Sequence, residues 1–112
     1  MIWFTISFME NIRTSEARAI DLMIGFMDLH PEICCLTKGV DPEEGCLVYY
    51  FLNPTYKIGD REFEDELSEL DLKIARETGH RCDVLVWPTA YFRGLLAYPF
   101  IGEMVYRKQE GN

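Results

Sequence analysis

The sequence predicts a single α+β domain over residues 1–112, built as a two-layer sandwich of one sheet and two main helices. Two stretches repeat apolar residues with the period of a helix, and several short runs are rich in β-branched and aromatic residues. Proline, glycine and asparagine separate these stretches. With 48% apolar and 27% charged residues over 112 positions, the chain can bury one core and is too apolar for disorder.

The N-terminal stretch is predicted to be a strand. Apolar residues occupy every second position of Ile2–Phe8, and a period of two is typical of strands. Asn11–Thr14 is a polar break. The stretch lacks the basic residues and cleavage site of an export signal and is too short to span a bilayer, so we expect a cytoplasmic protein. Translation starting at Met9 would also explain it.

A helix and a hairpin are expected next. Thr14 or Ser15 can cap a helix that runs to about Leu29 and stops before Pro31. Its apolar stripe is Ala17, Ile20, Ile24 and Met27. Strands over Glu32–Thr37 and Cys46–Leu52, joined by the turn-rich Lys38–Gly45, then form a hairpin.

The second helix has the clearest boundaries. Asp60 is placed to cap a helix over Arg61–Thr78, and Gly79 stands where a left-handed residue ends it. The capping aspartate marks the start of this helix and the glycine marks its end, so the sequence defines both boundaries. Cys82–Trp87 follows as a strand that ends at Pro88.

The C-terminal part is less regular. Thr89 can cap a short helix through Ala97, and Met104–Tyr106 is a short last strand. The first six elements follow the order βαββαβ, which is the split pattern of ferredoxin-like domains. In that pattern all neighbouring strands are antiparallel, and both helices cover one face of the sheet.

The central strands are apolar on both faces. Cys46–Leu52 places apolar or aromatic side chains on either side, and Cys82–Trp87 does the same except at Asp83. Such a sheet needs a cover on each side. The tail Pro88–Tyr106 offers one cover, with Tyr91, Phe92, Leu95, Leu96, Tyr98, Phe100 and Ile101. Because this tail is short for a whole face, we also expect self-association into a homo-oligomer, or a protein partner.

Charge and motifs exclude several classes of function. The net charge of −8 disfavours binding to nucleic acid or to an anionic membrane. The four cysteines form no Cys-x-x-Cys pair and are interpreted as reduced, small buried residues, so neither a metal site nor a cofactor is predicted. His30 and His80 each end a helix, at opposite ends of the domain. The acidic residues of Asp60–Asp71 are interpreted as a solvated helix face, with docking of a basic partner as the alternative.

The stretch Glu66–Tyr106 resembles the second half of the small nucleotidyltransferase domains of toxin–antitoxin pairs. It has the helix, the Asp-Val strand at Cys82–Val86, and a later Gly102-Glu103 followed by Tyr106. The resemblance implies that the hairpin Leu36–Leu52 replaces the family's first two core strands, and that Ser15–Leu29 is its leading helix. The family's Gly-Ser pair and metal-binding Asp-x-Asp pair are absent, and Asp83 corresponds to its third carboxylate. The resemblance therefore implies a catalytically inactive relative.

Two functional hypotheses follow. The first is a non-catalytic interaction or regulatory domain that self-associates. The alternative is an enzyme or small-molecule-binding domain with a nucleotide-related site. Asp83 is then the candidate acid or base, and Trp87, Tyr91 and Arg93 are the candidate binding residues.

Overall fold

The computed structural model describes residues 2–41, 43–88 and 103–108, with residues 2–14 described as backbone only. The elements are α1 (Ile2–Leu29), β1 (Cys35–Val40), β2 (Leu47–Leu52), α2 (Arg61–Thr78), β3 (Asp83–Trp87) and β4 (Glu103–Arg107). The α+β class, with two helices and one sheet, is confirmed. The order of elements is αββαββ, so the predicted order βαββαβ is wrong.

The difference lies in the first 29 residues. The predicted strand Ile2–Phe8 and the polar break Asn11–Thr14 are both wrong, because a single helix of 28 residues runs through them. Asn11–Thr14 contains neither proline nor glycine, so nothing in it interrupts a helix. The stretch before it is apolar at most positions, which satisfies a helical period as well as a strand period. The predicted end before Pro31 is confirmed.

The sheet is mixed, with the strand order β3-β2-β1-β4. β1 pairs antiparallel with β2 and with β4, whereas β2 pairs parallel with β3. The all-antiparallel sheet of the ferredoxin-like pattern is therefore wrong. β2 and β3 are joined through α2, and such a crossover returns the chain to the end of the sheet where β2 began.

The hairpin is confirmed, although β1 begins three residues later than predicted. Val40 pairs with Leu47, and the Asp41 amide donates to the Cys46 carbonyl over 2.8 Å. Gly45 has φ +72°, a left-handed conformation that side chains other than glycine rarely adopt. The turn therefore closes after Val40 and sets the register of β1 on β2.

Both predicted boundaries of α2 are confirmed. The Asp60 side chain accepts a hydrogen bond from the Phe63 amide over 3.2 Å, and the Gly79 amide donates to the Ala75 carbonyl. Gly79 has φ +69°. The capping residues that mark these ends in the sequence thus make the capping contacts in the structure.

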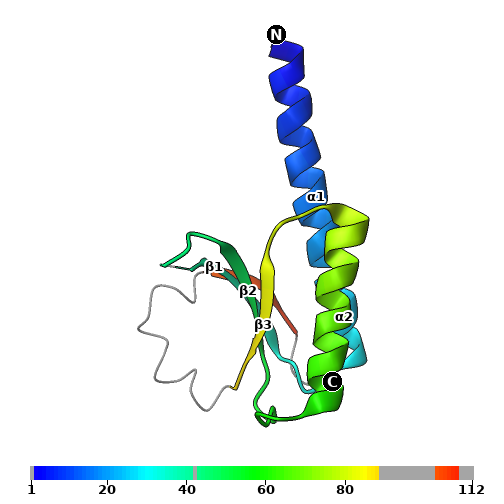
Figure 1. The fold of residues 1–112 in the computed structure, drawn as a ribbon, viewed down its shortest axis with the longest axis vertical. Coiled ribbons are helices and arrows are strands. Elements are labelled where there is room, and N and C mark those ends of the chain that lie inside the picture. Colours follow the sequence, from blue (N-terminus) through cyan, green and yellow to red (C-terminus); the bar gives the residue numbers. More distant parts are fainter. Residues whose placement is uncertain (1, 42, 89–102, 109–112) are drawn as a thin grey trace.

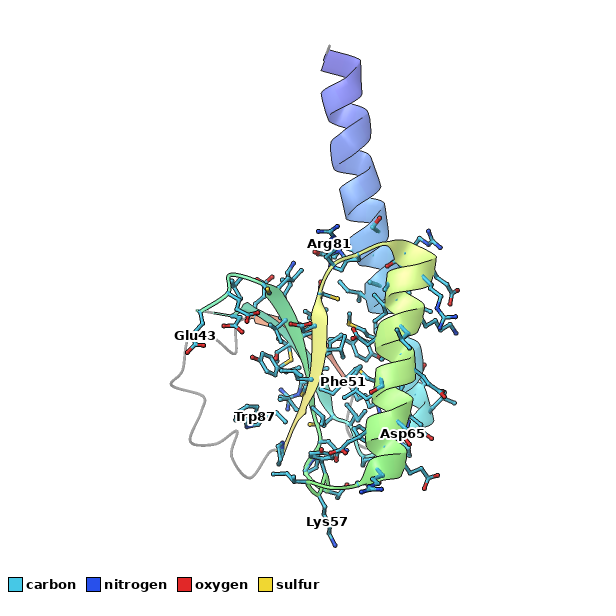
Figure 2. All side chains as sticks on the ribbon, viewed as in Figure 1. Glu43, Phe51, Lys57, Asp65, Arg81 and Trp87 are labelled. Carbon is cyan, nitrogen blue, oxygen red and sulfur yellow. The ribbon has the colours of Figure 1, made fainter. Side chains whose placement is uncertain are left out.

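Both helices cover one face of the sheet and run antiparallel to each other (Figure 1). The main core lies between these layers, where Phe26 of α1 stacks on Phe51 of β2 with ring centroids 5.2 Å apart. In Figure 2 the labelled Phe51 points from β2 towards the helices. The buried members of this core are Ala19, Met23, Phe26, Met27, Ile33, Leu36, Tyr49, Phe51, Phe63, Leu70, Ile74 and Val84.

The opposite face of the sheet carries a second apolar cluster. Cys35, Val48, Tyr50 and Leu52 are buried there, with Trp87 packed against them. The Tyr50 and Trp87 rings meet edge to face, with centroids 6.1 Å apart. β2 is therefore apolar and buried on both faces, as predicted, whereas Leu85 of β3 is 47% exposed.

The C-terminal predictions are tested in part. The last strand is confirmed as β4, which pairs with β1. The predicted helix Thr89–Ala97 and the seven tail side chains predicted to cover the sheet lie outside the described residues. Of the helices in the described ranges, neither is long and apolar enough to cross a bilayer.

Candidate functional site: a groove along strand β3

A hollow of about 680 Å³ lies at the N-terminal end of β3. Asp83, the first residue of β3, and Asp71 of α2 supply its carboxylates. The turn before β2 also contributes to the hollow, which Gly45, Cys46 and Leu47 line. Val48 of β2 pairs with Asp83, so this carboxylate lies beside the start of the central strand.

The electrostatics of this hollow favour protonated groups. Burial, and secondarily the negative charge of Asp83, raise the pKa of the Asp71 carboxyl above its ordinary value. Burial raises the pKa of the Cys82 thiol to about 11, with Asp71 and Asp83 adding to the effect. A thiol in this state is a poor nucleophile at neutral pH. The hollow therefore combines two carboxyl groups with a thiol that is not activated.

Two further hollows continue along β3 towards its C-terminal end. One, of about 400 Å³, is lined by residues of α2 and by Val84 to Trp87, and it shares Asp71 with the first hollow. The other, of about 360 Å³, shares Tyr56, Val86 and Trp87 with the second and extends to Ile58. We call this row of three adjoining hollows the β3 groove.

The predicted site residues do not form one compact pocket. Asp83 and Trp87 are the two ends of β3, and the rise over four residue steps separates them by about 13 Å. Trp87 points away from the helices in Figure 2, onto the second cluster. Tyr91 and Arg93 lie outside the described residues. Asp83 and Trp87 are connected through the groove and not through direct contact.

Sequence reasoning missed a polar cluster at the end of the helix–sheet interface. Lys38 of β1 donates to Glu16 of α1 over 3.0 Å, and the His80 ring nitrogen Nε2 lies 3.9 Å from the other Glu16 oxygen. The Tyr49 hydroxyl lies 3.3 Å from the same nitrogen. Burial raises the pKa of the Tyr49 hydroxyl and lowers that of His80. The predicted strand ends at Thr37, so the sequence places Lys38 in the turn and offers no signal of a helix-facing position.

This cluster is interpreted as structural. Each of its four members has a partner, and the cluster joins α1 to β1, to β2 and to the residue after the Gly79 cap. It contains no group of nucleophilic character, because burial keeps Tyr49 protonated and favours neutral His80. These contacts fix the position of α1 along its own axis relative to the sheet.

α1 continues far beyond this polar cluster. Glu16 contacts His80, which follows the end of α2, so Ile2–Ser15 precede the point where α2 ends. At 1.5 Å per residue this part of the helix spans about 20 Å. Figure 1 shows the blue first turns of α1 extending past both α2 and the sheet. We call Ile2–Met9 the apolar end of α1.

The histidines and cysteines give mixed outcomes. His30 follows α1 and His80 follows the cap of α2, and these two helix ends lie at opposite ends of the domain in Figure 1, as predicted. His30 contacts Glu66 over 2.8 Å. Cys35 is buried and Cys34 and Cys82 are partly buried, but Cys46 is exposed, so its prediction as a buried residue is wrong. Cys46 directly follows the left-handed Gly45 and precedes β2, which places it in the turn. Within the described ranges, no group of three potential ligands could hold a metal ion.

Comparisons with protein families, with curated proteins and with solved structures found no match.

Proposed function

We propose that this protein is a non-catalytic interaction domain that associates with a second copy of itself through the apolar end of α1. The observation that carries the proposal is the length of α1. Its first half extends past the layers of the fold, and the first turns, Ile2–Met9, carry apolar residues on most sides of the helix. An apolar helix surface is normally buried.

The size and charge of this end favour a second copy as its cover. An aromatic side chain buries roughly 150–250 Å² when it is covered. Trp3, Phe4 and Phe8, with Ile2, Ile6 and Met9, can therefore approach the roughly 800 Å² per partner of a stable interface. Ile2–Met9 contains no charged residue in a chain of net charge −8. Two copies meeting there experience little of the repulsion between their acidic bodies.

The chemistry of the hollow supports a non-catalytic role. Asp71 and Asp83 bring two carboxylates together, and the strand beside them, β2, carries no carboxylate where nucleotidyltransferases have the Asp-x-Asp pair. The order of helix, hairpin, helix and strand fits the order that the resemblance implies. Both points support a degenerate, regulatory relative of such domains.

Sedimentation equilibrium over a micromolar concentration series tests the proposal. We expect the full chain to sediment as a dimer and the Ile6→Glu variant as a monomer. Leu29→Glu is the matched control, because Leu29 is 78% exposed at the opposite end of the same helix. This variant should remain dimeric. A monomeric wild-type chain throughout the series, or equal dissociation by both variants, contradicts the proposal.

The second candidate function is nucleotide binding at Asp83. It is favoured by the position of the hollow, which opens beside the start of β2, where the resemblance implies an active site. Its test is thermal unfolding with magnesium and a nucleoside triphosphate, using Asp83→Asn as the control. A stabilisation that needs Asp83 supports this candidate, and an unchanged melting temperature removes it.

A further inference from the structure

We propose that the β3 groove binds an extended, basic peptide, which adds to the free edge of β3 as a further strand of the sheet. The proposal goes beyond self-association, because it uses a different surface and a different partner. Three features of the described residues carry it: the outward backbone groups of an edge strand, the adjoining hollows beside them, and the charge of these hollows.

β3 is an edge strand of the described sheet, since it pairs with β2 on one side only. The Trp87 carbonyl accepts from the Asn53 amide just beyond β2 over 2.9 Å. The N–H and C=O of one residue in a strand point to the same side, and the side alternates with each residue. Asp83, Leu85 and Trp87 therefore bond towards β2.

The backbone groups of Val84 and Val86 consequently point to the free edge. No hydrogen bond joins them to another element among the residues that the structure describes. An unpaired row of this kind is a template for strand addition. β3 is five residues long, so an added strand covers about 16 Å.

The groove provides the space that such a strand needs. The hollow lined by Val84–Trp87 and by α2 lies along this edge and reaches Val84, which is otherwise 6% exposed. Leu85 is 47% exposed, so the edge also offers apolar contact. Tyr56, Ile58 and Val86 line the far end, where they offer apolar contact to a peptide side chain.

Charge selects a basic peptide and disfavours a second copy. Asp71 and Asp83 form no ion pair with a described residue, although Arg81 also lines their hollow. The raised pKa of Asp71 reflects, besides burial, this proximity of like charges. A lysine or arginine beside Asp83 relieves the repulsion, whereas pairing of β3 with the β3 of another copy adds two more carboxylates.

The test measures binding of labelled peptides to the full chain by fluorescence polarisation. The probe is an eight-residue peptide that alternates lysine and valine. One comparison peptide replaces each lysine by glutamate, and another carries N-methyl groups on alternate backbone amides, which removes strand pairing and keeps the charge. We expect the lysine peptide to bind and the glutamate peptide not to bind. The N-methylated peptide should bind with an affinity at least roughly tenfold weaker than that of the lysine peptide.

Val86→Pro is the matched protein variant. The outward N–H of Val86 makes no bond to β2, so proline at this edge position should leave the hydrogen bonds between β2 and β3 intact. It should weaken binding of the lysine peptide. Asp71→Asn and Asp83→Asn should each weaken the affinity for the lysine peptide a few-fold.

If Val86→Pro fails to fold, as judged by circular dichroism, the N-methylated peptide decides alone. Equal binding of the N-methylated or glutamate peptide, or no binding of the lysine peptide, overturns the proposal. So does a Val86→Pro chain that folds and binds normally. Dimerisation that is lost in Val86→Pro would instead assign this edge to a second copy, which also overturns it.

Discussion

Replacing Gly25 or Gly79 by alanine makes the same chemical change in two helical settings, and the effects on stability should have opposite signs. Gly25 lies inside α1 with ordinary helical φ, and a Cβ added there meets no atom within 4 Å. Alanine is favoured over glycine inside a helix by roughly 0.5–1 kcal/mol. Gly25→Ala should therefore stabilise the protein by about that amount.

Gly79 has equal space but a different backbone. A Cβ there also meets nothing within 4 Å, yet φ is +69°. The cost of Gly79→Ala is therefore backbone strain alone, about 1–2 kcal/mol for a left-handed residue with a side chain. Steric crowding contributes to neither substitution, so the difference between the two variants isolates the backbone conformation.

Urea unfolding followed by far-ultraviolet circular dichroism measures both effects. The two variants should differ by about 1.5–3 kcal/mol in free energy of unfolding, and each kcal/mol should shift the melting temperature by roughly 4 °C. Destabilisation by Gly25→Ala would refute the continuous, uncrowded helix through this position. An unchanged Gly79→Ala would refute the left-handed end of α2. Protein concentration is held constant, since association changes apparent stability.

Three other predictions address the cap, the core and the partly buried His80. Asp60→Ala should lower the free energy of unfolding in urea by about 1 kcal/mol, because the side-chain cap to the Phe63 amide is lost. Asp60→Ser should retain most of this stability, since serine also caps helices. An equal loss of stability in both variants would contradict the capping role. Phe51→Ala should cost about 3–5 kcal/mol because Phe51 is fully buried, whereas Leu72→Ala, at a 55% exposed position, should stay within about 0.5 kcal/mol. Burial, partly opposed by Glu16, lowers the pKa of His80 below its ordinary 6.5, so the unfolded chain takes up this proton first. Its contribution to stability is present above pH 6.5 and declines as the pH falls through that value towards the lower folded pKa; His80→Gln should flatten this part of the profile, and an unchanged profile would contradict the assignment.

The predictable elements are those whose signals are local. Asp60 and Gly79 define α2 from both ends, because capping depends on residues within one turn of the helix. Pro31 likewise limits α1, and the apolar run of β2 exceeds anything around it. Of the candidate site, Asp83 and Trp87 were placed on the right strand.

The first half of α1 could not be assigned locally. Its apolar residues fit the strand period and the helix period equally well, and Asn11–Thr14 suggests a loop only by polarity. The packing of the following helical turns decides that this segment is a helix. Ala19, Met23 and Met27 are fully buried against the sheet, and the helix they establish continues backwards at little cost.

By itself, the sequence determined that the chain forms an α+β domain with a capped helix α2, a hairpin, and strands apolar on both faces. Only the tertiary structure decided the order β3-β2-β1-β4, the parallel pairing of β2 with β3, and hence which strands lie at the edges of the described sheet. It also brought Glu16, Lys38, Tyr49 and His80 together from four separate segments. The physical reason is range: caps, turns and periodicity act over a few residues, whereas strand neighbours and grooves arise between segments that local preferences do not relate.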